Sequence, residues 1–373
     1  MRKRRCEVQL HNALVVMHKS YADFCKPSSK KQHFSIFGGF YEILKLNACM
    51  IYIFAVFLSI CYTIIEVNAM HTPYYSFNQY LQEEFGEKLY KLSLETGCTC
   101  PNRDGTLGTG GCIFCSAGGS GEFAEPAADD IQVQMERAKT RVAKKFKGEH
   151  YIAYFQSYTN TYGDPEHLRN IFFAAAENPC IRALSIATRP DCLPPQILEM
   201  LAELKRIKPV FVELGLQTIH EETAKCIRRG YPLSVYQQAF EDLHKIGINV
   251  VTHIILGLPY ETREQMLESV RYVSKIGTDG VKLQLLHVLK GTDLEVLYKQ
   301  GKFEVLTKQE YIDLLCDCIE ALPPQTVIHR LTGDAPRSLL VAPMWSANKK
   351  DVLNSIQAAF HQRNVRQSKN LKI

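Results

Sequence analysis

Four cysteines lie close together in the segment GCTCPNRDGTLGTGGCIFCSAGG, which covers residues 97–119. They are Cys98, Cys100, Cys112 and Cys115. The run KLYKLSLET before them alternates as a strand does, and a helical pattern begins at Asp129. The cysteines are therefore expected on a loop at the carboxyl end of a strand, where α/β folds collect functional residues. Thiolates at this spacing are suited to hold a metal ion or an iron–sulfur cluster.

Two other interpretations of these cysteines stay open at this point. Buried, inert thiols or a disulfide pair are disfavoured by the seven glycines from Gly97 to Gly119, which let a backbone fold closely around a compact group. A Cys-x-Cys pair followed by Cys-x-x-Cys can also close a tetrahedral site around a structural zinc ion. The rest of the chain has to decide between zinc and a cluster.

The composition is that of an ordinary globular protein. With 373 residues, 46% hydrophobic and 22% charged, the chain can form one large α/β domain or two smaller ones. The net charge of +5 resides in residues 1–69, which carry nine Lys and Arg against four Asp and Glu. The remainder is balanced, which argues against a globally basic nucleic-acid surface but leaves room for a local basic patch.

The leader at residues 1–69 contains an uncharged run of twenty residues, 46–65, which is long enough to span a bilayer. The cations before that run would keep the amino terminus in the cytoplasm and place the cysteines in an oxidising space, where disulfides are favoured. We therefore expect Met70 to be the true start and the leader to lie outside the mature fold, with a membrane anchor as the alternative. The protein is then expected in the cytoplasm, away from membranes.

Strand-like runs alternate with amphipathic helical stretches from residue 90 onward. Several strands are apolar on both faces, as a parallel sheet covered by helices requires. Six such units predict an α/β fold, a partial (βα)6 TIM-like barrel over residues 70–290. The strands are expected to begin at residues 91, 151, 183, 209, 249 and 280, and the helices to cover about 129–146, 165–177, 194–206, 220–228, 233–246 and 261–276.

Residues 291–373 are expected to form a short C-terminal α/β extension. The stretch at 307–322 is typical of a helix, TVIHRL of a strand, and KKDVLNSIQAAFHQR of a terminal helix. Cys316 and Cys318 point to different faces of the first helix, which favours core packing over a shared metal.

Several motifs in this order resemble those of radical S-adenosylmethionine (SAM) enzymes. Cys100 is followed by eleven residues, Cys112, two residues and Cys115, with the aromatic Phe114 just before the last cysteine. The motifs CPNRDG, ELGLQT, ILGLP, HVLKGT and HRLTGDAP resemble a branch akin to the Elongator catalytic subunit and the MiaB-type methylthiotransferases. The resemblance runs from about residue 75 to 359.

That resemblance implies a cofactor pair and an activity. Cys100, Cys112 and Cys115 would bind a [4Fe-4S] cluster, with Cys98 as a bystander because CPNRDG begins at Cys100. The iron without a thiolate would take the amine and carboxylate of SAM, which is then cleaved reductively to a 5′-deoxyadenosyl radical. An electron donor such as flavodoxin or ferredoxin is implied as a partner.

SAM-binding groups are expected at the ends of the strands. These cofactor-binding candidates are Phe114, Gln156, Ser157, Thr188, Arg189, Glu213, Gln217 and Gly257. Arg189 can take a carboxylate bidentately, although a surface arginine before proline is an equal interpretation. Glu213, inside the apolar run VFVELGLQ, is costly to bury without a partner, which favours a ribose or amine contact. His253 is more often a satisfied core residue than a ligand.

The substrate is the least determined part. Candidate substrate residues are Lys282, His287, Arg330, Asp334 and Arg337. Kinship with Elongator and the methylthiotransferases points to tRNA, at the side chain of a wobble uridine. A small metabolite or a protein is the alternative substrate, and a zinc-stabilised binding protein without catalysis is the alternative class.

Overall fold

The computed structural model describes residues 73–119, 124–125 and 130–371. The leader and its apolar run at 46–65 lie outside the described residues. Within the described part, none of the helices combines the length and apolarity that a membrane span needs.

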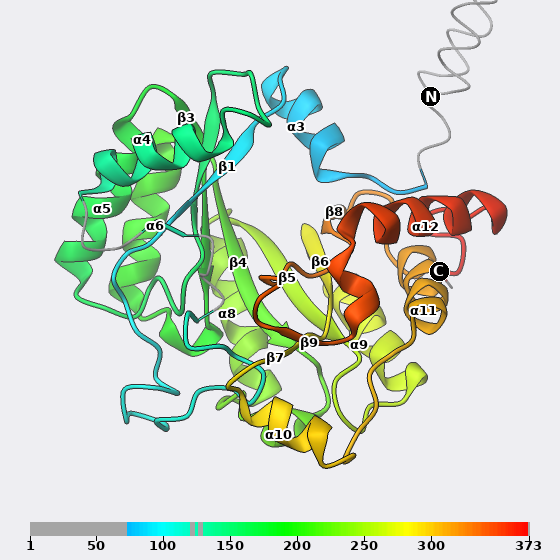
Figure 1. Ribbon diagram of the computed structural model, residues 1–373. Helices are drawn as coiled ribbons and strands as arrows, with labels where there is room; N and C mark the ends of the chain where they lie inside the picture. Colours follow the sequence, from blue (N-terminus) through cyan, green and yellow to red (C-terminus); the bar gives the residue numbers. More distant parts are fainter. Residues whose placement is uncertain (1–72, 120–123, 126–129, 372–373) are drawn as a thin grey trace, which may run out of the picture. The chain divides into compact units, whose positions relative to one another are not determined.

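A curled sheet of seven parallel strands forms the centre of the fold (Figure 1). The order is β1-β2-β3-β4-β5-β6-β8, and each strand pairs in parallel with the next. The strands are β1 (Tyr90–Leu94), β2 (Tyr151–Phe155), β3 (Ile181–Thr188), β4 (Val210–Gln217), β5 (Asn249–Leu256), β6 (Gly280–Leu285) and β8 (Val327–Arg330). Because β1 and β8 do not pair with each other, the sheet is a half-barrel with one open side.

The partial-barrel prediction is confirmed, and the six expected strands all form. The strand expected in the C-terminal extension, at TVIHRL, becomes β8 and joins the same sheet beside β6. It does so because helix α11 (Lys308–Glu320) packs against α9 (Arg263–Lys275) and returns the chain parallel to β6, as in the preceding strand–helix units. The sheet therefore has seven strands instead of six.

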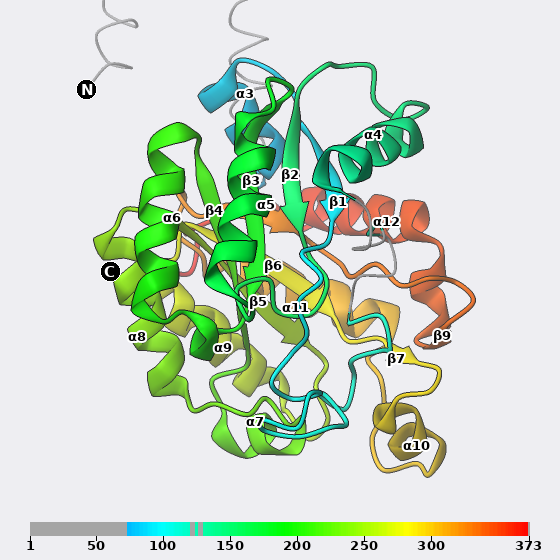
Figure 2. The same ribbon diagram turned by 90° about the vertical axis from the view of Figure 1, so that its left-hand side faces the viewer.

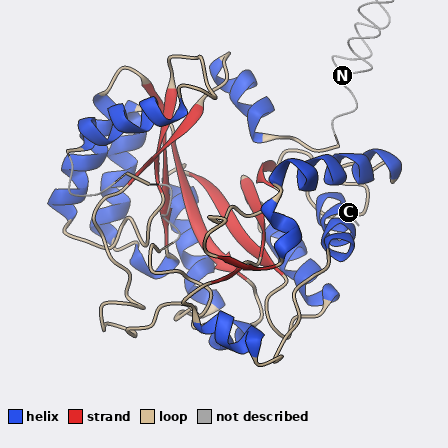
Figure 3. Ribbon diagram, viewed as in Figure 1, coloured by secondary structure: helices blue, strands red, loops and turns tan. Residues whose placement is uncertain are grey.

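Helices cover the outer face of the sheet, so that strands apolar on both sides stay dry (Figure 3). In chain order these helices are α4 (Ile131–Val142), α5 (Pro165–Glu177), α6 (Pro195–Ile207), α8 (Leu233–Lys245), α9 and α11, and the short helix α7 (Glu221–Cys226) follows β4. Local signals place their starts: Asp164 caps α5 ahead of Pro165, and capping boxes begin α9 at Thr262 and α11 at Thr307.

Smaller elements complete the half-barrel, and the sequence analysis did not predict most of them. Helix α3 (Phe77–Phe85) closes the end where the strands begin, with Phe77 packed edge-on against Phe211. Helix α10 (Asp293–Lys299), strands β7 (Val288–Leu289) and β9 (Leu340–Ala342), and the expected terminal helix α12 (Lys349–Gln362) follow the barrel (Figure 2). Cys316 and Cys318 are buried in the main core, as expected.

Candidate active site

A cavity of about 1000 Å³ occupies the inside of the half-barrel. Its lining comes from the inner face of the sheet, the cysteine loop after β1, and residues of α3, α4 and α12. These segments are far apart in the sequence, and the curled sheet with its helices brings them together around one cavity. The predicted site residues can therefore be sorted by whether they reach it.

The three predicted cluster ligands all reach the cavity. Cys100, Cys112 and Cys115 are partly exposed and line its wall, together with Phe114. Cys98 is not among the lining residues; it packs beside the main core, with its sulfur next to Gly163. The arrangement agrees with the assignment of Cys98 as a bystander, which stays a prediction.

Hydrogen bonds hold the two ends of the cysteine loop together. The Arg103 guanidinium donates from Nη2 to the carbonyl oxygens of Cys115, at 2.9 Å, and Ser116, at 2.6 Å. Gly111, at φ +73°, allows this approach, because a Cβ there would lie 2.9 Å from Arg103 Nε. Asn102 Nδ2 donates to the Arg228 carbonyl at 2.7 Å and lies 3.4 Å from Cys112 Sγ.

The three thiols on one cavity wall are of a type and number that can hold an iron–sulfur cluster. Among the described residues, no three or more His, Cys, Asp or Glu side chains are arranged to hold a single ion. Thiolates that bind different irons of one cubane cluster do not have to converge on one point. Burial raises the pKa of the Cys112 thiol to about 11, so a bound cation has to displace its proton. Three cysteines on one cavity wall thus suit a cluster with one iron left open.

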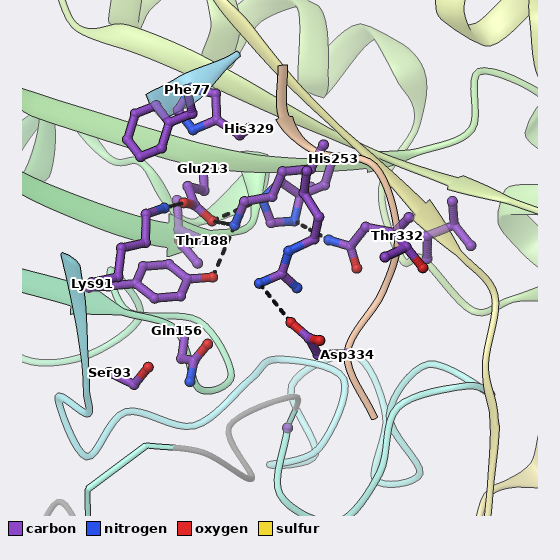
Figure 4. A pocket seen from close by; sticks show the side chains of 18 of the residues that line it. Phe77, Lys91, Ser93, Gln156, Thr188, Glu213, His253, His329, Thr332 and Asp334 are labelled. Carbon is purple, nitrogen blue, oxygen red and sulfur yellow. Dashed lines mark hydrogen bonds and ion pairs between the residues drawn. The ribbon is translucent and has the colours of Figure 1, made fainter. Parts of the chain in front are cut away.

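A buried ionic network forms the floor of the cavity (Figure 4). Both oxygens of the fully buried Glu213 are occupied: Lys91 Nζ lies 2.5 Å from Oε1, and His253 Nε2 lies 3.0 Å from Oε2. The Lys282 ammonium also contacts Oε2. Burial alone would raise the pKa of Glu213, but Lys282 and Lys91 outweigh it and hold that pKa well below its usual range.

Burial lowers the pKa of two groups that contact Glu213, His253 and Lys282. Burial, followed by the nearby Lys282, lowers the pKa of His253 to about 4, so the imidazole is neutral near pH 7. Its Nε2–H then donates to Glu213, while Nδ1 accepts from Gln284 Nε2 at 3.4 Å. Burial lowers the pKa of Lys282 well below its usual range, and its ammonium donates to the Tyr154 hydroxyl at 3.1 Å.

The predicted cofactor residues are mostly in the cavity wall. Those that line it are Phe114, Gln156, Thr188, Arg189, Glu213 and Gln217. Ser157 and Gly257 do not line it: the Ser157 hydroxyl donates to Glu95, and the Gly257 N–H points to Met266 Sδ at 3.0 Å. The sequence analysis expected a ribose or amine contact to compensate the cost of burying Glu213. Cations of the protein compensate this cost, so a ribose or amine contact is not needed to explain why Glu213 is buried.

Arg189 and Gln156 differ in how many hydrogen-bond donors they have left for a ligand. Arg189 already makes a bidentate pair with Asp191, at 2.9 Å from Nε and 2.7 Å from Nη2, and donates from Nη1 to the Arg229 carbonyl. Gln156 has a buried Nε2 amide group without a hydrogen-bond partner among the described residues. A buried donor left unpaired is costly, so Gln156 is the side chain best placed to gain from a ligand.

Some of the predicted substrate residues line the cavity and others do not. Lys282, Arg330 and Asp334 line the cavity, and Arg330 Nη2 lies 3.4 Å from Asp334 Oδ2. His287 does not line the cavity; burial lowers its pKa to about 4. Arg337 is exposed and also outside the cavity lining.

Sequence reasoning missed several residues of the site. Lys91 and Tyr154 belong to the floor network, and Arg103 clamps the cysteine loop. One signal for Lys91 was present: like Glu213, it is a charged residue inside a strand of mostly apolar residues, where an unpaired charge would be costly to bury. Arg103 had no such signal, because its partner is a backbone carbonyl.

Comparisons with known proteins agree with this geometry. Residues 96–273 match the model of the Radical SAM superfamily, and residues 278–362 match the Radical_SAM C-terminal domain. The uncharacterized protein YtqA of Bacillus subtilis is 45% identical over 296 residues, 79% of this chain and 92% of that protein.

More distant similarity extends to Elongator proteins. Elongator complex protein 3 of Schizosaccharomyces pombe is 30% identical over 185 residues, 48% of this chain but 33% of that protein's length. The solved structure of the archaeal Methanocaldococcus infernus Elp3 has a TM-score of 0.57 at 17% identity, over 75% of this chain and 64% of that one, and supports the fold alone. The chain belongs to the radical SAM superfamily of enzymes.

Proposed function

We propose that this enzyme reductively cleaves SAM at a [4Fe-4S] cluster held by Cys100, Cys112 and Cys115 and thereby modifies tRNA, at the side chain of a wobble uridine. When bound, the cluster and SAM supply a 5′-deoxyadenosyl radical that removes a hydrogen atom from the substrate. The thiols on one cavity wall support the first part, because three ligands leave an iron for SAM. A flavodoxin or ferredoxin is the proposed electron donor.

The positive charge of the cavity lining supports RNA as the substrate. Among the described residues, ten lysines and arginines but three carboxylates line the cavity, and two of these cations, Arg189 and Arg229, are paired with Asp191 and Glu221 outside the lining. The chain beyond the leader is nearly neutral, so this excess is local. Because nucleic acid carries a negative charge on every nucleotide, an electropositive cavity suits an RNA substrate better than an uncharged metabolite. The similarity to Elongator complex protein 3 supports the same substrate class.

The protein's own residues bind SAM, orient the substrate base and exclude water from the cavity floor. Gln156 offers its unpaired amide group to the polar end of SAM. The Glu213 network holds Lys282 and Tyr154 in fixed positions on the floor, where a base bound in the cavity would meet them. The closed end at α3 keeps water from the floor, because aromatic rings fill it.

The first experiment tests the cofactor. Full-length protein purified without air and reconstituted with iron and sulfide should be brown and hold about four irons per chain. It should cleave SAM when given a reductant. A colourless protein with one tightly bound zinc ion would instead identify a zinc-stabilised binding protein.

The second experiment tests the substrate. Total tRNA from cells with and without the gene is digested to nucleosides and compared by mass. We expect one nucleoside to disappear in the deletion strain and its precursor to accumulate. Identical nucleoside profiles would rule out tRNA and favour a small metabolite, while leaving the cofactor assignment intact.

A further inference from the structure

A dense run of cations marks the end of α4 and the turn after it. Residues 137–147, RAKTRVAKKFK, contain six lysines and arginines and no carboxylate. Lys139 and Arg141 lie in the last turn of α4, where cations favour the C-terminal end of the helix dipole. Lys144, Lys145 and Lys147 lie beyond the end of α4 at Val142, so they have no such role and can attract a partner of opposite charge.

Part of this run, together with Lys88, forms an exposed surface that we name the basic strip. It consists of Lys88, Arg141, Lys144, Lys145 and Lys147, all of them exposed. Arg141 is paired with Glu125 at 2.8 Å. The four lysines make no ion pair with any described residue, whereas Lys139 on the same helix contacts Glu136 at 2.7 Å. The strip therefore holds unneutralised positive charge.

The basic strip is continuous with the cavity. Lys88, Arg141 and Lys145 line the cavity that also contains Cys100, Cys112 and Cys115. Phe146 places the strip at the end where the strands begin, because its ring packs on Tyr90 at 5.6 Å and Tyr151 at 5.4 Å, the first residues of β1 and β2. The strip thus borders the open side of the half-barrel, between the edge strand β1 and solvent.

The lysines of the basic strip lie at the opposite end of β1 from the cysteine loop, whereas Arg141 reaches Glu125, whose backbone N–H bonds to the Ser93 carbonyl oxygen near the loop. The loop follows Leu94, whereas Lys88 precedes β1, and the five residues of β1 span about 16 Å at about 3.3 Å per residue. An acidic electron donor has to come close to the cluster, so it has little to gain from docking here. A flexible polyanion that enters the cavity with one nucleotide can reach both places at once.

We propose that the basic strip binds the phosphate backbone of the RNA substrate next to the nucleotide that enters the cavity. This inference rests on the proposed function and adds the surface through which the RNA is held. The lysines supply sequence-independent phosphate contacts, while the cavity selects the base. The RNA then enters through the open side of the half-barrel, past β1.

The test uses the full-length protein and tRNA isolated from cells that lack the gene. The variant Lys144→Ala/Lys145→Ala/Lys147→Ala is compared with Lys205→Ala/Lys245→Ala/Lys275→Ala, which removes the same charge from exposed ends of α6, α8 and α9. Affinity is measured between about 50 and 200 mM salt. Iron content after reconstitution and the urea unfolding midpoint serve as controls for folding.

The strip variant should bind tRNA on the order of tenfold more weakly, with a salt slope reduced by about two to three, since each phosphate contact contributes about 0.7 to 0.9. The control variant should bind like wild type. If the strip variant fails to fold, Lys145→Glu alone provides the same comparison.

Other outcomes separate this inference from the proposed function. If wild type binds tRNA and the strip variant does so equally well, the strip is not the RNA contact, and the proposed function stands. If the strip variant binds tRNA normally but loses reduction by flavodoxin, the strip is a donor site and the inference is wrong. If wild type binds no tRNA at low salt, both fail.

Discussion

Arg103 Nη2 donates a hydrogen bond to the backbone carbonyl oxygen of Cys115, at 2.9 Å. Arg103 follows Cys100 by three residues, so this bond ties the first predicted ligand to the segment that carries the other two. The same guanidinium reaches the Ser116 carbonyl. The geometry of the cysteine loop therefore depends on one side chain that is not itself a ligand.

Replacing Arg103 by alanine should loosen the loop and lower cluster occupancy. Two carbonyl acceptors lose their donor, at a cost of about 1–3 kcal/mol for the cluster-binding conformation. Iron per chain after anaerobic reconstitution, and its loss to a chelator over time, measure the effect. Arg337→Ala removes an exposed arginine outside the cavity lining and is the matched control. Equal iron retention in both variants would show that the clamp is dispensable.

Single alanine variants of Cys100, Cys112 and Cys115 should each abolish reductive SAM cleavage. Two thiolates are too few to hold a cluster that leaves an iron open for SAM. Cys98→Ala should keep most of the activity, because its sulfur lies beside Gly163 and outside the cavity lining. SAM cleavage is followed by the appearance of 5′-deoxyadenosine. An inactive Cys98→Ala beside an active Cys100→Ala would reverse the ligand assignment.

Glu213→Gln should destabilise the protein strongly. It leaves the buried Lys282 without its counter-charge, and breaking one side of a buried pair costs roughly 3–5 kcal/mol. The double variant Glu213→Gln/Lys282→Met removes both charges and should recover much of this loss. Urea unfolding of the three proteins gives the comparison. A single variant as stable as wild type would mean that Lys282 is neutral at rest.

Stability should fall as the pH drops from about 6.5 towards 4. The pKa of His253 is about 4 in the folded protein and near 6.5 when unfolded, so in this window the unfolded chain binds more protons. Folding is then penalised progressively as the pH falls, by a few kcal/mol per histidine, and His287 adds to the effect in the same direction. Urea midpoints at several pH values measure it. In His253→Gln the dependence should be smaller, and an unchanged dependence would exclude His253 as its source.

Gln156→Leu should weaken SAM binding by about tenfold or more, because a hydrogen bond to a charged group contributes about 1.5–3 kcal/mol. The leucine has a similar shape but no donor, and the buried Nε2 loses no hydrogen bond to any residue that the structure describes. Iron content should not change, since Gln156 is outside the cysteine loop. SAM affinity is measured by equilibrium binding to the reconstituted protein. Unchanged affinity would place the amine or carboxylate of SAM elsewhere.

The chain's periodicity placed six of the seven strands in the sheet and predicted the helices between them, and the resemblance of its motifs indicated the family. The run VFVELGLQ has the apolar residues Val210, Val212, Leu214 and Leu216 on the face that helices cover, and it forms β4. The expected helix at 165–177 coincides with α5, because Asp164 and Pro165 mark its start in the sequence itself. These signals are local: a few neighbouring residues decide them, and folding does not override them.

The floor of the cavity was decided by tertiary structure. Glu213 meets Lys282, 69 residues away, and Lys91, 122 residues away, because parallel strands bring residues of similar height to the same inner face. Neither spacing has a pattern in the sequence, and alternation could not tell which face of each strand points inward. The sequence also did not indicate that β8 pairs with β6, because that pairing depends on how distant segments pack. Local order follows from neighbouring residues, whereas the identity of a buried charge's partner depends on how distant strands pack.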